Sequence, residues 1–147
     1  MEKRSGPTHW RAAPLEVSAP RLAEEGPAER IAGILQRLGA LPGVRGVAIA
    51  DQAGLPVASE LPGASRVLEV TAMTALALQS CSSVLTNLTG ESLETIMIEG
   101  ATSTIVIHRL GNGELGLFCV LDKTGSVGLV WLESRRCARE IEEVLGV

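Results

Sequence analysis

Apolar residues recur along the chain with two different periods, one typical of helices and one typical of strands. Residues 27–39 predict a helix, because they begin with Pro27, end with Gly39 and carry apolar side chains at helical spacing: Ile31, Ile34, Leu35 and Leu38. Residues 44–50 and 55–59 predict two strands, joined by turn-forming residues into a β-hairpin.

Residues 64–89 predict a long helix of unusual composition. The segment contains no glycine or proline, and its only charged residues are Arg66 and Glu69. One apolar face suits a core. The opposite face is small and nearly neutral, whereas an ordinary surface helix carries charges there. We therefore expect the second face to contact a partner; the alternative is a helix buried on both faces within its own domain.

Three further strands and a final helix follow. The strands are predicted over residues 92–99, 102–110 and 114–121, with glycine-containing turns between them. Ser126 is a suitable N-cap for the last helix, which Gly146 ends. The predicted order is helix, two strands, long helix, three strands, helix.

Composition limits the classes of partner. The 147 residues have a net charge of −4 and only three aromatic residues, Trp10, Phe118 and Trp131, so neither the basic surface nor the stacking platform of a nucleic-acid-binding protein is expected. The mean hydropathy of +0.26 is high, yet no uninterrupted apolar run reaches the roughly 18–20 residues of a membrane span. The apolar surplus is expected in a core or a protein interface.

The first 26 residues differ from the rest. They contain Pro7, Pro14 and Pro20, balanced charges and no regular period, so we predict a flexible tail over 1–26 and one domain over 27–147. We expect no secretory signal peptide, because the chain does not begin with a charged segment followed by an apolar one. The three cysteines are widely spaced, so we expect neither disulfides nor a metal site. A cytoplasmic location is expected.

Motifs that suggest chemistry have simpler explanations. Gly111-x-Gly113-x-x-Gly116 matches a dinucleotide-binding spacing, but here the glycines join two strands. Asp51-x-x-Gly54 is explained as a turn, and His108 as a structural residue on a strand. We therefore predict no catalytic residue, no cofactor and no metal. On the last helix, offsets of four predict ion pairs of Arg136 with Glu140 and of Arg139 with Glu143.

The segment 41–59, LPGVRGVAIADQAGLPVAS, resembles the opening hairpin of the Roadblock/dynein light chain domain family, and the resemblance extends over about residues 28–146. It includes the long helix, the three strands, and Leu121-Asp122-Lys123 leading through Gly128-Leu129 into the last helix. The resemblance implies a Roadblock/profilin-like α+β fold, with a five-stranded antiparallel sheet sandwiched by helices in the order α-β-β-α-β-β-β-α.

The resemblance also implies a homodimer, in which the third strands join two sheets and the long helices pack antiparallel. The residues expected at this interface are Leu68, Ala72, Ala75, Leu76, Gln79 and Ser83 on the helix, and Thr95 and Met97 on the strand edge.

The resemblance further implies a GTPase partner, because members of the family commonly regulate or scaffold small Ras-like GTPases, and bacterial members of the MglB type resemble partners that bind a GTPase across their paired long helices. The chain is accordingly expected to bind such a GTPase and to stimulate its GTP hydrolysis, while having no active site of its own. Candidate partner-binding residues are Arg66, Glu69, Ser80, Asn87 and Arg45. A non-catalytic scaffold that assembles a signalling or motility complex is the first alternative, and a small-molecule-sensing module the second.

Overall fold

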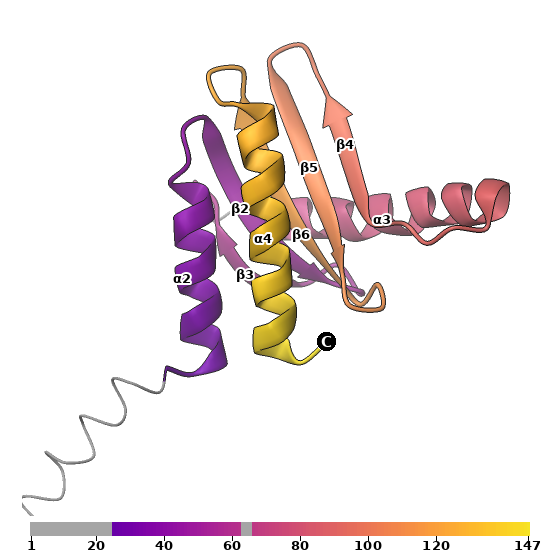
Figure 1. Ribbon diagram of the computed structural model, residues 1–147, viewed down its shortest axis with the longest axis horizontal. Coiled ribbons are helices and arrows are strands. Elements are labelled where there is room, and N and C mark those ends of the chain that lie inside the picture. The colour runs from indigo at the N-terminus through magenta and orange to yellow at the C-terminus, as the bar shows by residue number, and fades with distance from the viewer. Residues whose placement is uncertain (1–24, 63–65) are drawn as a thin grey trace, which may run out of the picture.

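The computed structural model describes residues 25–62 and 66–147 and contains a single sheet with helices on both faces (Figure 1). The predicted tail lies outside the described residues except for its last two positions, and so do residues 64 and 65 of the predicted long helix. The elements follow the predicted order: α2 Pro27–Gly39, β2 Val44–Asp51, β3 Pro56–Glu60, α3 Val67–Thr89, β4 Thr95–Glu99, β5 Ser103–Leu110, β6 Leu115–Asp122 and α4 Val127–Leu145.

The sheet has the strand order β3-β2-β6-β5-β4, and every neighbouring pair is antiparallel. Its two edges are therefore β3 and β4. The predicted α+β fold, with a five-stranded antiparallel sheet and this order of elements, is confirmed.

Two separate apolar clusters hold the helices on the sheet. On one face, α2 and α4 pack over buried side chains that include Leu35, Val106, Leu117 and Ile141. On the other face, α3 packs over a smaller cluster of Leu78, Leu93, Ile96, Ile107 and Phe118. Of the helices in residues 25–62 and 66–147, two thus cover the first face and one covers the second.

The long helix α3 crosses the sheet near one end of the strands. An added Cβ on Gly116, the second residue of β6, would lie 2.4 Å from Leu78 Cδ1, so any larger residue there would force the Leu78 side chain to move. Gly54, in the β2–β3 turn, has a φ of +86° and lies close to the backbone of Ala72. The C-terminal half of α3 then extends past β4, beyond the edge of the sheet (Figure 1).

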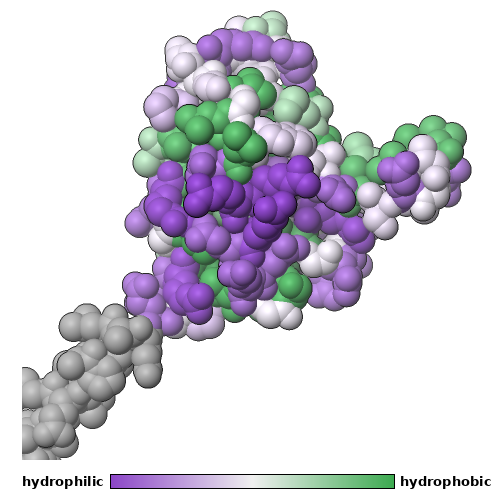
Figure 2. All heavy atoms as spheres, in the orientation of Figure 1, coloured by the Kyte–Doolittle hydropathy of each residue, from purple (hydrophilic) through white to green (hydrophobic). Residues whose placement is uncertain are grey.

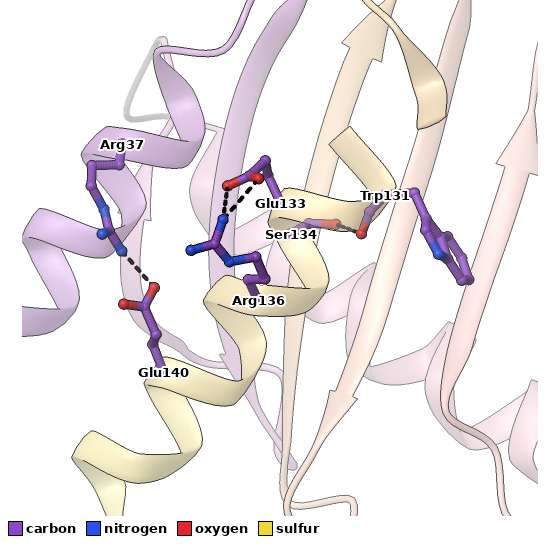
Figure 3. A network of polar contacts seen from close by, with 6 residues as sticks. All are labelled: Arg37, Trp131, Glu133, Ser134, Arg136 and Glu140. Carbon is purple, nitrogen blue, oxygen red and sulfur yellow. Dashed lines mark hydrogen bonds and ion pairs between the residues drawn. The ribbon is translucent and has the colours of Figure 1, made fainter. Parts of the chain in front are cut away.

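The ion pairs predicted within α4 do not form among the described residues. Arg136 pairs instead with Glu133, at 3.2 Å, and Glu140 pairs with Arg37 of α2, at 2.6 Å (Figure 3). Spacing along one helix indicates which residues share a face, but Glu140 lies on the side that faces α2, where Arg37 is within reach. The charges therefore join α2 to α4.

Candidate functional site

The exposed face of α3 carries five of the twelve large apolar side chains that are exposed among the described residues. Only three residues of this 23-residue helix are buried, Thr71, Thr74 and Leu78. Its exposed apolar side chains are Leu68, Met73, Leu76, Val84 and Leu88, with exposed fractions from 56% to 79%. Figure 2 shows apolar residues on the protruding end of this helix. Exposure on this scale is typical of a protein-interaction surface.

Two threonines form much of the buried face of α3. The Thr71 hydroxyl donates to the Val67 carbonyl at 3.1 Å, and the Thr74 hydroxyl donates to the Val70 carbonyl at 2.8 Å. Since each buried hydroxyl is satisfied within the helix, it needs no partner from the sheet. The helix can therefore lie close to the glycine of β6.

One side of α3, which we call the turn flank, faces the hairpin turns of its own chain. It consists of Leu68, Ala72, Ala75, Gln79 and Ser83. Ala72 and Ala75 lie against Gly54 of the β2–β3 turn. Ala75 and Gln79 also line a recess of about 180 Å³ that the β5–β6 turn closes. Ala75 is half-buried and the other four are exposed.

The opposite side, which we call the open flank, faces the uncovered part of the sheet. It consists of Met73, Ala77, Ser80, Val84 and Leu88. Ala77 packs with the cluster that includes Ile105 and Val120, both only partly buried. Ile98 on β4 is 45% exposed on this same face. Helix periodicity alone did not identify this flank, because it contains no information on where the hairpin turns lie.

No described residue pairs with the outer edge of strand β4. The Arg109 N–H donates to the Glu94 carbonyl at 2.9 Å, which places that pair of residues in hydrogen-bonded register. The alternation then directs the N–H and C=O groups of Thr95, Met97 and Glu99 away from β5. Met97 is 47% exposed, and its backbone is at the centre of this free edge. Such an edge is a template for another strand.

His108 fixes β4 to the helix above it. Its Nδ1 lies 3.0 Å from the Thr95 hydroxyl and its Nε2 lies 2.7 Å from the Ser134 hydroxyl, which itself donates to the Trp131 carbonyl. A neutral imidazole that donates from Nε2 and accepts at Nδ1 satisfies every group. Burial, together with the positive charge of Arg135, lowers the pKa of His108 to about 4. The predicted structural role of this histidine agrees with this network.

The predicted partner-binding residues do not all lie on one surface. Arg66 and Glu69 form an ion pair at 2.6 Å near the start of α3, and Ser80 and Asn87 are exposed along the same helix. Arg45 lies apart from them at the start of β2, where its Nε contacts Asp122 at 2.6 Å.

Arg45 has a local role beside Asp122. Hydrogen bonds from Thr124, and then the Arg45 guanidinium, lower the pKa of Asp122 to about 2. This carboxylate joins the first residues of β2 to the loop before α4. The Arg45 side chain is still 70% exposed, so its role in binding a partner stays a prediction, on a surface apart from α3.

Two further kinds of group among the described residues are potential metal ligands and cysteine thiols. These residues contain no group of three or more His, Cys, Asp or Glu side chains that could hold a metal ion. Burial raises the pKa of Cys119 to about 12 and also raises that of Cys137, so both thiols are unreactive.

The length and composition of α3 would also allow it to cross a membrane, and it is the one helix of the described residues that meets this criterion. Core helices of soluble proteins meet the same criterion. Its contacts with Gly54 and Gly116 give α3 a defined place on the sheet.

Comparison with known proteins gives a family and a fold. The family model described as Roadblock/LC7 domain matches residues 31–122. No curated protein matches the sequence.

Several solved structures are similar. One, described as MglB with tetrameric arrangement, has a TM-score of 0.75 and 18% identity, covering 82% of this chain and 91% of that one. The gliding protein MglB of Thermus thermophilus gives 0.74 and 20%, covering 82% and 92%. MglB of Myxococcus xanthus gives 0.72 and 21%, covering 79% and 94%.

Proposed function

Since the chain belongs to the Roadblock/LC7 domain family, we propose that two copies pair through β4 and the open flank of α3, and that the paired helices bind a small Ras-like GTPase in the cytoplasm. The observation that carries this proposal is the largely exposed apolar helix α3, which its own sheet covers on one side only. The MglB proteins among the similar structures support a general role in regulating GTPases or in assembling complexes around them.

The free edge of β4 suits a second copy of itself. Met97 is the central residue of this five-residue strand. A two-fold axis through Met97 pairs all five residues, with Thr95 opposite Glu99 of the partner subunit. On the face of α3, Ile96 then lies opposite Ile98 of the partner subunit. No like charges meet across the axis, so the edge is self-complementary.

The open flank is self-complementary in the same sense. If two α3 helices run antiparallel about an axis between Ser80 and Cys81, Met73 lies opposite Leu88 and Ala77 lies opposite Val84. Large side chains thus meet smaller or flexible ones, and neither pair is charged. The partner helix would also cover the exposed Ile98 and its neighbours on the sheet. This pairing uses the flank opposite to the one that the sequence predicted, with Thr95 and Met97 retained on the strand edge.

The residues predicted at the dimer interface then have a different role. Leu68, Ala72 and Leu76 remain on the outer side of the paired helices, together with Glu69 and Asn87, and all five are exposed. An apolar centre with few charges at its margin is typical of a surface that binds another protein. We assign the GTPase to this outer surface.

The proposed effect on hydrolysis is indirect. Among the described residues of α3 and its N-cap there is one arginine, Arg66. It forms an ion pair with Glu69 at 2.6 Å. A regulator without an arginine to insert can still accelerate hydrolysis by ordering the catalytic groups of the GTPase itself. A scaffold that binds the GTPase without changing its rate is the second candidate, because the same apolar surface would serve it.

The test uses the Ras-like GTPase encoded nearest to this chain in its genome. Single-turnover GTP hydrolysis and binding are measured with the wild-type chain, with Leu76→Glu, and with the matched control Leu132→Glu, which alters an exposed leucine on α4. We expect faster hydrolysis with the wild type and the control, and loss of both binding and stimulation with Leu76→Glu. Binding without acceleration would favour the scaffold. Equal effects of the two substitutions would contradict the assignment of the surface.

A further inference from the structure

A recess between α4 and the start of β4 contains two arginines that belong to α4. Its volume is about 280 Å³, and its lining includes Arg135 and Arg139 together with two carboxylates, Glu94 and Glu142. The Glu142 carboxylate is already occupied, since it accepts the Gly111 N–H at 2.8 Å. Arg109 also borders the recess, but its guanidinium donates to the Leu93 and Asn112 carbonyls. The recess therefore offers the arginines of α4 to a further carboxylate.

Arg135 is held in place on the side of the recess nearest the edge strand. Its guanidinium lies 6.0 Å from the centre of the Trp131 ring, which orients it. Its ion-pair partner Glu94 lies 3.4 Å away and has a side chain that is 77% exposed. Such a pair contributes little and is easily exchanged for another. Arg135 can thus accept a second carboxylate.

We propose that Arg135 binds the Glu99 carboxylate of the partner subunit, so that each recess is completed by the other copy. This inference rests on the dimer in the proposed function. A two-fold axis through Met97 places Glu99 of the partner subunit directly opposite Thr95. Residues 95, 97 and 99 share the face of β4 that α4 covers, because side chains alternate along a strand. Opposed residues have Cβ atoms about 5 Å apart, so long side chains readily bridge the remaining gap.

Glu99 is free to make this contact. Among the described residues of its own chain, its ion-pair partner is Lys123, at 3.5 Å, and its side chain is 76% exposed. The two-fold axis produces two such contacts in each dimer, one on either side of Met97. Exposed ion pairs add little affinity, but a one-residue slip of the strands would separate both pairs. The contact therefore fixes the register of the joined sheet.

The test exchanges the two charges between chains. Arg135→Glu and Glu99→Arg are prepared as separate full-length variants, and their dimer dissociation constants are measured by sedimentation equilibrium. Each homodimer then contains two like-charge contacts, and we expect its dissociation constant to rise by about tenfold. A mixture of the two variants forms a heterodimer in which both contacts again join opposite charges. We expect that heterodimer to bind within about threefold of the wild type.

The matched control is Arg136→Glu, the next residue on α4, which pairs with Glu133 on the side away from β4. We expect it to dimerise as the wild type does and, on mixing with Glu99→Arg, to restore only one of the two contacts, as the wild-type chain would, whereas Arg135→Glu restores both. Damage to one chain's fold cannot be repaired by mixing, so rescue reports the contact itself. Failure of mixing to restore affinity in a dimeric protein would overturn this inference alone. A weak dimer has a dissociation constant on the order of 100 µM. A wild-type chain that is still monomeric at that concentration would overturn the proposed dimer as well.

Discussion

Replacing Val84 by glutamate tests which flank of α3 forms the helix–helix contact. In the isolated protomer the Val84 side chain is 59% exposed, and pairing of the open flanks would bury it against Ala77 of the partner subunit. Burying the remaining area of a valine contributes about 1 kcal/mol, so two symmetric copies contribute about 2 kcal/mol to the dimer. Loss of that amount raises the dissociation constant by about thirtyfold. Desolvating two introduced carboxylates increases the effect further.

The matched control is Ser83→Glu, which introduces the same charge one residue away on the turn flank. Sedimentation equilibrium over a hundredfold range of concentration gives both dissociation constants. We expect Val84→Glu to dissociate and Ser83→Glu to remain within a few-fold of the wild type. The reverse result, dissociation by Ser83→Glu alone, would refute our choice of flank and restore the interface predicted from the helical wheel.

Three further predictions concern the protomer. The pKa of His108 is about 4 in the fold against 6.5 when unfolded, so the unfolded chain binds a proton that the fold excludes. The free energy of unfolding should fall by about 3 kcal/mol as the pH drops from 6.5 to 4. Urea titrations at several pH values measure this free energy, and the same pH dependence in His108→Gln would contradict the prediction. Gly116→Ala forces its Cβ against Leu78 and should lower the free energy of unfolding by about 1–3 kcal/mol. Gly33→Ala, whose added Cβ would meet nothing within 4 Å on helix α2, should raise that free energy by about 0.5–1 kcal/mol. Equal shifts of the two variants in thermal unfolding would show that the contact between α3 and β6 is not tight. The folded protein should react with one equivalent of a thiol reagent at Cys81, which is half-buried, because the other two cysteines are buried; three equivalents without denaturant would contradict the packing.

Much of the fold could be predicted from the sequence because it depends on local patterns. In the part of the chain that the structure describes, apolar spacing identified the three helices, and alternation with turn residues identified the five strands. The glycines from Gly111 to Gly116 do join β5 to β6, so no helix follows them. The start of β4 was wrong by three residues, since the chain must first return from the protruding end of α3 to the sheet.

The site could be predicted only in part, because it depends on distant segments. The sequence identified α3 as a helix with an uncharged second face, and that face is exposed. A helical wheel could not show that Ala72 and Ala75 lie against Gly54, since the position of the β2–β3 turn depends on tertiary packing. For the same reason the sequence did not indicate that Glu140 would pair with Arg37 rather than with Arg136.

Amide hydrogen exchange along β4 tests the central claim most directly. In a lone protomer only alternate residues of this strand, Ile96 and Ile98, donate to β5, and the amides of Thr95, Met97 and Glu99 face outward. Measured by NMR at a concentration where the protein is dimeric, all five amides should be protected, and dilution should release the outward three alone. Rapid exchange of those three amides in the dimer would show that the copies meet somewhere other than this edge.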